Sequence, residues 1–398
     1  MNKSTFFSGQ PIFTQLLQLI SKTSVINIAK EQRADRYAKR FNTYEHLVTM
    51  LYSIFNHCNS LREVTTGMLA TEQRLQHLGI RYHPRRSTLA DANIRRSSDV
   101  FAQIYYSLFD RYRNFLSDSR KSSKASKLYI FDTTTISLFH EVLRTSGQNP
   151  KGKRKGGIKV HSLIRSDQDV PMMIRFSAAA ANDSQFLKEV YLPKGSLLVF
   201  DRGYHDFTAF NRFTDSGVTW ITRRHRLFAF EVLEHLPLKN EESILSDRII
   251  KLGHRSSVRV VARLIKYQSP DSDEEFEFVT NNFKMKASTI ATLYRKRWQI
   301  EVLFKRMKQN YPLRYFLGDS ENAIKIQIWC SLIADLLLKI IKKAAASRWS
   351  FSNLAAMIRL HLMTYIDLAG FLKSPEKALM KLFITSKHYH HNQLRLIT

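Results

Sequence analysis

The sequence has little cysteine and no long uninterrupted apolar segment. Its two cysteines, Cys58 and Cys330, predict neither a zinc site nor a disulfide framework, which is typical of proteins from a reducing compartment. The first residues lack the continuous apolar core of a signal peptide. The most apolar run, residues 326–341, is interrupted by polar side chains and is shorter than the roughly 20 residues of a membrane span. We therefore expect a soluble, cytoplasmic protein without a membrane partner.

Acidic residues are also scarce, because 34 Asp and Glu stand against 62 Lys and Arg, a net charge of +28. Such an excess is repulsive within a folded chain and indicates a polyanionic partner. A membrane surface is the alternative to nucleic acid, but the positive charge is spread along the chain rather than gathered beside one apolar segment. The composition therefore favours nucleic acid.

Three common catalytic motifs are missing as well. The chain contains no GxSxG, no GxxxxGK[ST] and no HExxH, so nothing in it predicts a serine hydrolase, a P-loop enzyme or a zinc protease. It also contains no internal repeat. With 398 residues and 44% apolar content it is long enough for two or three folded domains.

The pattern along the chain predicts three regions. Residues 1–118 have apolar residues at helical spacing, and Ser60 is a candidate N-cap. A polar, serine-rich linker follows. Residues 119–312 alternate strand-like and helical segments, with short β-like runs at about 227–283, either an insertion or the end of the sheet plus an insertion. Residues 313–398 look helical and basic, and their apolar segment predicts core or a dimer contact.

Two aspartates follow apolar strand-like runs. Asp132 follows LYIF, and Asp201 follows SLLVF and begins the sequence DRGY, in which Gly203 would permit a sharp turn. The ends of strands are where α/β sheets expose functional groups. The alternative for each aspartate is a cap or turn residue.

A third carboxylate lies on a predicted helix over residues 294–308. Tyr294, Arg297, Glu301 and Lys308 share an arc of roughly 60° on this helix. A basic amphipathic surface helix is the alternative, and Lys305 could replace Lys308. Together with the two aspartates, Glu301 would complete a set of hard oxygen ligands suited to Mg²⁺ or Mn²⁺. Such sites perform phosphoryl transfer with two metal ions.

Other charged residues have weaker claims. Asp183 is expected to cap the helix after it, and Asp206 and Asp169 to lie in turns or at the surface. His161 and His205 could carry protons, but a histidine without a known partner is more often structural. Cations crowd a glycine-rich loop and a predicted helix start with its N-cap at Ser87, and both predict phosphate contacts. These cations are Lys151, Lys153, Arg154, Lys155 and Lys159 in the loop, and Arg85 and Arg86 at the helix.

Several of these residues, in this order, resemble the motifs of a known protein family. Asp132 before two threonines, Asp201 in DRGY, and Tyr294-x2-Arg297-x3-Glu301-x6-Lys308 together resemble the DDE transposases of bacterial insertion sequences, in the insertion sequence 4 branch with its Tyr-Arg-Glu-Lys signature. The phrases SLREV and RSTLADAN resemble the domain that precedes that catalytic core. The resemblance covers most of residues 1–310.

The resemblance implies an α/β fold, with a ribonuclease-H-like catalytic core, a β-rich insertion, and helical N- and C-terminal regions. Asp132, Asp201 and Glu301 would hold two Mg²⁺ ions, and the other signature residues would bind phosphates. Some members use a tryptophan of the insertion for a flipped base. Here no tryptophan lies between residues 220 and 298, and the aromatic candidates are Phe228, Phe230 and Tyr267.

The expected function is a DNA transposase that cuts the inverted ends of its element and joins the 3′-hydroxyls to target DNA, in the bacterial cytoplasm and associated with the nucleoid. The helical N-terminal domain, residues 1–118, is expected to bind DNA, and together with the loop of residues 151–159 it would hold the terminal repeats and the DNA backbone. A homodimer on double-stranded DNA is expected, because two ends must be processed together. The alternatives are a metal-dependent nuclease that does not join strands and a non-catalytic DNA-binding derivative of a transposase.

Overall fold

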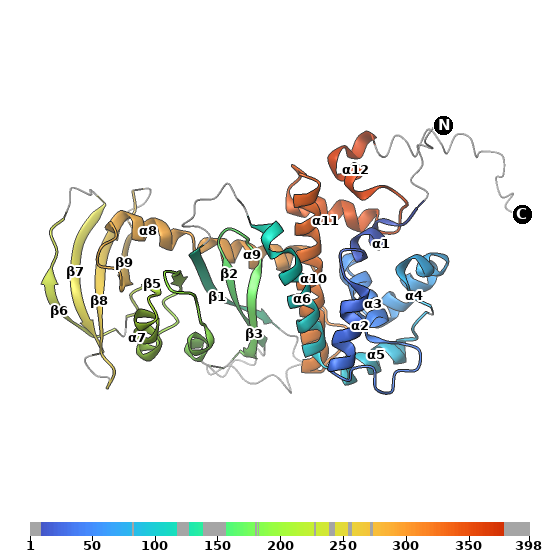
Figure 1. Ribbon diagram of the computed structural model, residues 1–398, viewed down its shortest axis with the longest axis horizontal. Coiled ribbons are helices and arrows are strands. Elements are labelled where there is room, and N and C mark those ends of the chain that lie inside the picture. Colours follow the sequence, from blue (N-terminus) through green and yellow to red (C-terminus); the bar gives the residue numbers. More distant parts are fainter. Residues whose placement is uncertain are drawn as a thin grey trace, which may run out of the picture. The chain divides into compact units, whose positions relative to one another are not determined.

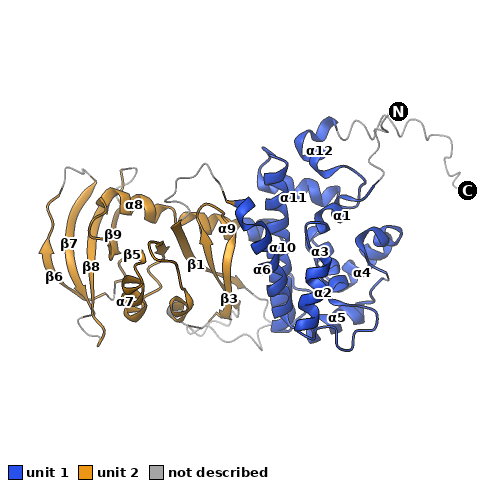
Figure 2. Ribbon diagram, in the orientation of Figure 1, with its two compact units in different colours: residues 1–116, 306–398 blue, residues 117–305 orange. Residues whose placement is uncertain are grey.

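The chain folds into two compact units. The computed structural model describes residues 9–377 except for 82, 118–126, 138–156, 180, 182, 227, 239–242, 254–256 and 271–273. Unit 1 comprises residues 1–116 and 306–398, and unit 2 comprises residues 117–305 (Figure 2). Among the residues just given, no helix is both long enough and apolar enough to cross a membrane.

Unit 1 is helical (Figure 1). Its elements are α1 (Ile12–Leu17), α2 (Lys22–Glu31), α3 (Thr43–Phe55), α4 (Leu61–Ala70), the 3₁₀ helix η1 (Glu72–Leu78), α5 (Arg86–Arg95), α6 (Ser98–Leu116), α10 (Glu321–Ala344), α11 (Phe351–Leu360) and α12 (Leu368–Lys373). The helical character expected for both ends of the chain is therefore present in the described residues.

Side-chain caps explain where several of these helices begin. The Asn42 side chain accepts the Glu45 amide while the Glu45 side chain accepts the Asn42 amide, a capping box that starts α3. Ser60 caps α4 as predicted, by accepting the amide of Glu63 at 3.1 Å. The prediction for α5 was wrong, because its N-cap is Arg85 rather than Ser87, and Arg85 makes no side-chain capping bond.

Helix α10 forms the centre of unit 1, where it packs against α3 and α6. The polar residues that interrupt its apolar sequence are buried and bonded. Gln327 bonds three backbone groups, of residues 312, 315 and 317, at 2.7–2.8 Å. Asp335 accepts two hydrogen bonds from Arg306, each 3.0 Å long. This burial favours the core alternative for α10 over the subunit contact.

Unit 2 is built on one sheet of nine strands (Figure 1). The strands are β1 (Leu128–Ser137), β2 (Gly157–Arg165), β3 (Pro171–Ala178), β4 (Leu197–Phe200), β5 (Thr219–Arg223), β6 (Phe230–His235), β7 (Ile244–Leu252), β8 (Val260–Gln268) and β9 (Glu275–Thr280). Their order is β3-β2-β1-β4-β5-β9-β8-β7-β6. Strand β1 is parallel to β4, and β4 to β5, whereas the other neighbours are antiparallel. The mixed α/β class expected from the sequence is confirmed.

The β-like region at about 227–283 continues this sheet, because β9 pairs with β5. Strand β7 was missed, since its sequence ILSDRIIKL contains an aspartate, an arginine and a lysine. In the structure Asp247 of β7 receives two hydrogen bonds from Arg263 of β8, and both side chains are 7% exposed. A buried ion pair therefore takes a position that looks like a polar turn in the sequence.

The helical elements of unit 2 are a 3₁₀ helix η4 (Asp183–Glu189), α7 (Phe207–Asp215), α8 (Ala287–Arg295) and α9 (Trp298–Asn310), whose last turns lie in unit 1. Helix α7 lies against β5 and β8, and α8 against β4 and β5. The core joins Phe131 of β1 and Phe200 of β4 to Phe210 and Trp220, all fully buried. This apolar layer fixes the strands that carry the site.

Candidate active site

The register of β1 and β4 brings the two aspartates together. Phe131 lies opposite Phe200 in the parallel ladder, so Asp132 and Asp201 each come directly after one residue of this pair. Strand β4 ends at Phe200, whereas β1 continues to residue 137 along β2. Asp201 therefore follows its strand, and Asp132 lies where β1 loses its parallel partner. Gly203 has no positive φ, so the sharp turn expected there does not depend on glycine.

Glu301 enters the same site from the first turn of α9. The single helix predicted over residues 294–308 was wrong, because α8 ends at Arg295 and α9 begins at Trp298. Arg297 lies in the turn between them. It donates to Asp132 Oδ2 at 2.8 Å and to Glu301 Oε1 at 2.5 Å. The break thus places a cation between two of the three predicted carboxylates.

The pKa of Asp132 responds to the charges of both other carboxylates. Burial raises its pKa to about 6; Arg297 and the Thr133 amide oppose this rise, and the charges of Asp201 and Glu301 add to it. The Asp132 side chain is 15% exposed and that of Glu301 32%. Concentrated negative charge in a partly buried place is what a divalent cation relieves, so the chemistry of this donor set fits one. In this structure, however, the three side chains are not gathered into one ligand set: Arg297 bonds Asp132 and Glu301, and among the described residues no three acidic, histidine or cysteine side chains lie close enough together to hold an ion.

A hydroxyl network behind Asp132 was not predicted as a unit. The Thr133 hydroxyl lies 2.6 Å from His161 Nδ1 and is hydrogen-bonded to the Tyr204 hydroxyl. His161 also bonds Ser177 at 2.8 Å through Nε2, and burial lowers its pKa to about 4. His161 is therefore structural, the alternative that its isolated position in the sequence favoured. The sequence features that could have indicated this network are the threonines after Asp132 and the tyrosine of DRGY.

The predicted phosphate contacts have different surroundings. Tyr294 is 8% exposed, and its ring lies beneath the Arg297 guanidinium, 5.8 Å from the ring centroid. Lys159 donates to Asp183 at 2.8 Å, so Asp183 is an ion-pair partner. Lys308 is exposed on α9.

The remaining predicted cations fall into two groups. Arg85 and Arg86 are exposed at the start of α5. The loop residues Lys151, Lys153, Arg154 and Lys155 lie outside the described residues.

The surroundings of the other candidate site residues indicate what each of them does in this structure. Phe228 and Tyr267 are buried, at 3% and 8% exposed, so neither can stack on a base in this structure, whereas Phe230 is half-buried. Asp206 caps α7 by accepting the Ala209 amide at 3.0 Å. The ring of His205 stacks on His225 with the centroids 4.9 Å apart.

Comparison with known families identifies the chain. The Transposase DDE domain family matches residues 123–337, more than half of the chain and all three predicted carboxylates. The chain belongs to this family. It is a DNA transposase of an insertion sequence, as predicted, and its family implies DNA cleavage and strand transfer. Transposase DDE domains generally use divalent metal ions. A domain of unknown function (DUF4372) matches residues 8–81.

Individual relatives agree with this assignment. A protein of Sinorhizobium fredii, named as a transposase, is 29% identical over 263 residues, 65% of this chain and 71% of the relative. A protein of Synechocystis, named as the transposase of insertion sequence element IS4SA, is 28% identical over 64% of this chain and 71% of the relative. A solved piggyBac transposase complex with hairpin DNA shares 10% identity at a TM-score of 0.47, covering 98% of this chain and 87% of that one, a likeness that carries no conclusion.

Proposed function

We propose that unit 2 is a ribonuclease-H-like catalytic domain in which Asp132, Asp201 and Glu301 are the catalytic carboxylates of a metal-dependent transposase. The strand order β3-β2-β1-β4-β5, with β2 antiparallel to both of its neighbours, supports this fold. The observation that carries the site is the Arg297 bridge, since it joins Asp132 to Glu301 although 169 positions separate them in the chain.

The three carboxylates would hold Mg²⁺, or Mn²⁺ in its place. The bound metal would supply activation of the attacking oxygen and stabilisation of the leaving oxygen in an in-line displacement at phosphorus. The protein's part is to position the three side chains. Asp132 and Asp201 are fixed by adjacent strands, and Arg297 orients Asp132 and Glu301 through hydrogen bonds. We therefore assign Arg297 to positioning these carboxylates rather than to binding DNA.

The substrate is proposed to be double-stranded DNA that carries the terminal inverted repeats, together with target DNA. Water attacks first at the end of the element, and the freed 3′-hydroxyl then attacks the target. Exposed cations on helices, Lys308, Arg85 and Arg86, are proposed backbone contacts. We further propose that a homodimer forms on DNA, because the two ends of one element must be cut and joined together.

Metal binding can be tested without activity. Isothermal titration of the full chain with Mn²⁺ should show binding that is lost or weakened at least tenfold in Asp132→Asn, Asp201→Asn and Glu301→Gln. Asp206→Asn is the matched control, since Asp206 caps α7 instead of facing the site. Unchanged Mn²⁺ binding in all three variants would overturn the assignment of ligands.

Strand transfer separates the two enzymatic alternatives. Wild-type protein, labelled duplexes with the terminal repeats, a target plasmid and Mg²⁺ should give both cut ends and joined products. The three variants should give neither while still binding the duplex. Cut ends without joined products would indicate a nuclease, and full activity in any one variant would remove that residue from the site.

A further inference from the structure

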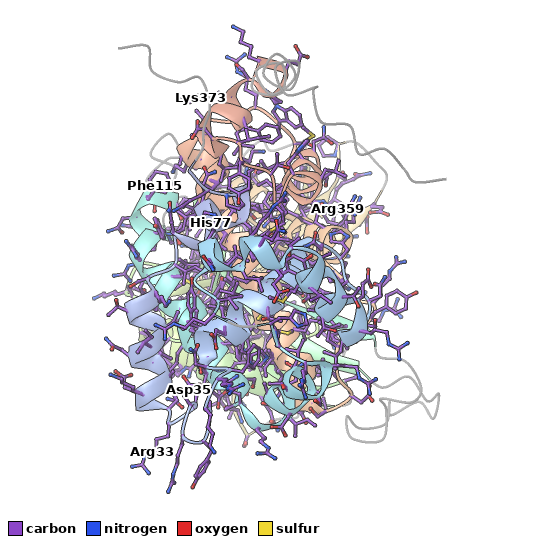
Figure 3. All side chains as sticks on the ribbon, turned by 90° about the vertical axis from the view of Figure 1, so that its right-hand side faces the viewer. Arg33, Asp35, His77, Phe115, Arg359 and Lys373 are labelled. Atoms are coloured by element: carbon purple, nitrogen blue, oxygen red, sulfur yellow. The ribbon has the colours of Figure 1, made fainter. Side chains whose placement is uncertain are left out.

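A cationic pocket of about 720 Å³ lies within unit 1, far along the sequence from the three carboxylates. One wall is the segment of residues 33–41, which links α2 to α3, and the other is α5. Figure 3 shows Arg33 at the outer edge of this segment and Asp35 nearer to the body of the unit. None of the residues singled out as DNA contacts above lines this pocket.

The charge of the pocket is strongly one-sided. Six cations line it, namely Arg33, Arg36, Lys39, Arg40, Arg95 and Arg96. Asp91 is the single acidic residue among the lining residues, and it is already paired with Arg95 at 2.8 Å. The four cations of the 33–41 segment are exposed, and in the described part of the chain no ion pair joins any of them to a carboxylate. Their charge is thus available to a ligand.

Hydrogen bonds hold the floor of the pocket in place. Arg96 is 6% exposed and donates to Asp35 Oδ1 at 3.1 Å and to the Phe41 carbonyl at 2.7 Å. Thr43 donates to the same Asp35 oxygen at 2.9 Å, next to the capping box that begins α3. These bonds hold both ends of the segment, so its exposed cations lie on a fixed support. Arg96 makes both of its bonds through Nη2, and its Nε and Nη1 are buried without a hydrogen-bond partner in the described part of the chain.

An aromatic hydroxyl accompanies the exposed cations. Tyr37 lines the pocket and is 86% exposed, and the Arg36 guanidinium lies 5.2 Å from the centroid of its ring. A large aromatic side chain so exposed gains little from the protein itself. Arginine and lysine side chains with a tyrosine hydroxyl are the groups that contact phosphate oxygens along a DNA backbone.

We propose that this pocket is a binding site for the sugar-phosphate backbone of DNA, with Arg33, Arg36, Lys39 and Arg40 as the phosphate contacts and Tyr37 as an added donor. The choice of DNA over another polyanion rests on the proposed function. The 33–41 segment lies in the region matched by the domain of unknown function, residues 8–81, and the pocket would be one place where the N-terminal domain, expected from the sequence to bind DNA, contacts the backbone. It is separate from Arg85 and Arg86, which lie at the opposite end of α5 from Arg95.

The test is the salt dependence of DNA binding by the full chain. Each lost phosphate contact should reduce the slope of log K against log salt by about 1, so Arg36→Ala with Arg40→Ala should reduce it by about 2 and weaken binding about tenfold near 0.1 M salt. Arg36→Lys with Arg40→Lys keeps the charge and should keep most of the slope. The matched control, Arg62→Ala with Arg111→Ala, removes two exposed cations outside the pocket and should leave the slope near that of wild type.

The inference would be overturned by a wild-type slope in the Arg36/Arg40 alanine variant, or by an equal loss of slope in the control variant. It would also be overturned if the alanine variant lost binding to phosphatidylserine vesicles while its DNA binding was unchanged. Failure of the pocket is distinguishable from failure of the proposed function. If the wild-type protein cuts and joins ends and the alanine variant binds DNA normally, only the proposal of the pocket fails. If the protein binds DNA through the pocket but does not cut it, only the proposed catalytic function fails.

Discussion

The Arg297 guanidinium lies 2.8 Å from Asp132 Oδ2, and this bond joins the turn before α9 to the middle of β1. Asp132 is thereby kept next to a cation although burial raises its pKa. Arg297 also donates to Glu301, so one side chain bonds two carboxylates from opposite ends of the sequence of unit 2.

Replacing Arg297 should therefore damage the site more than removing a nearby surface charge. We expect Arg297→Ala to slow cleavage of labelled element ends by about 100-fold, because two carboxylates lose the donor that orients them. Arg297→Lys should recover part of the rate, since a single ammonium cannot hold both partners as a guanidinium does. Lys296→Ala, an exposed neighbour, should cleave at close to the wild-type rate. Equal rates for Arg297→Ala and wild type would remove Arg297 from its positioning role.

The Thr133 hydroxyl should position the two aspartates from behind. Thr133→Val keeps the shape but leaves the hydroxyl of Tyr204 and the ring nitrogen of His161 without this partner. We expect a loss of about 1–3 kcal/mol in the free energy of unfolding, measured by urea denaturation. End cleavage should slow while DNA affinity stays constant. Thr135→Val, on an exposed part of β1, is the control, and a matching effect there would contradict the network's role.

The stability of the chain should fall in mild acid because of His46. Burial, with help from the charge of Arg96, lowers the pKa of His46 to about 3, whereas an unfolded histidine titrates near 6.5. The unfolded state therefore binds the proton first, so this stabilisation is complete above about pH 6.5 and is lost as the pH falls toward 3. Between pH 7 and 5 we expect a loss of about 2 kcal/mol from this group. Urea unfolding at both pH values should show a smaller change in His46→Gln, and an identical change would contradict the assignment.

The buried pair of Asp335 and Arg306 should be costly to break. The Asp335 side chain is 3% exposed, accepts two bonds from Arg306 and lies 3.4 Å from the Tyr311 hydroxyl. Asp335→Ala leaves a buried guanidinium without its anion, and we expect a loss of about 3–5 kcal/mol in the free energy of unfolding. Asp110→Ala breaks an exposed pair with Arg113 and should cost less than about 1 kcal/mol in the same urea experiment. A similar loss in the free energy of unfolding for both variants would show that burial of the pair does not cause the larger loss expected for Asp335→Ala.

The sequence predicted the parts of unit 2 whose pattern is local. Strand-like apolar runs located β1 to β5, because period-2 and apolar-run signals depend on neighbouring residues. Asp201 was correctly expected just past the end of its strand, whereas Asp132, also expected at a strand end, lies in the middle of β1. Strand β7 was missed since the charge of its Asp247 is neutralised by Arg263 on another strand, which no local pattern can indicate.

The site was harder to predict for the same reason. The spacing of Arg297 and Glu301 correctly indicated that they lie close together, but an unbroken helix was expected where α8 and α9 are separate. The role of Arg297 depends on Asp132, which is distant in sequence, so its surroundings looked like those of any phosphate-binding arginine. Four of the six cations in the pocket at residues 33–41 are neighbours in the sequence, but the pocket was not foreseen, because its second wall forms only where α5 approaches this segment.

The pairing of Phe131 with Phe200 has a consequence for how this enzyme can vary. Both rings are fully buried, so the alignment of the two aspartates that follow them is enforced by the same packing that keeps the sheet folded. A slip of β1 by one residue would turn Phe131 out of the core and carry Asp132 to the other side of the sheet. The spacing of the two acids is therefore protected by the cost of unfolding, whereas surfaces that meet DNA can change residue by residue without disturbing it.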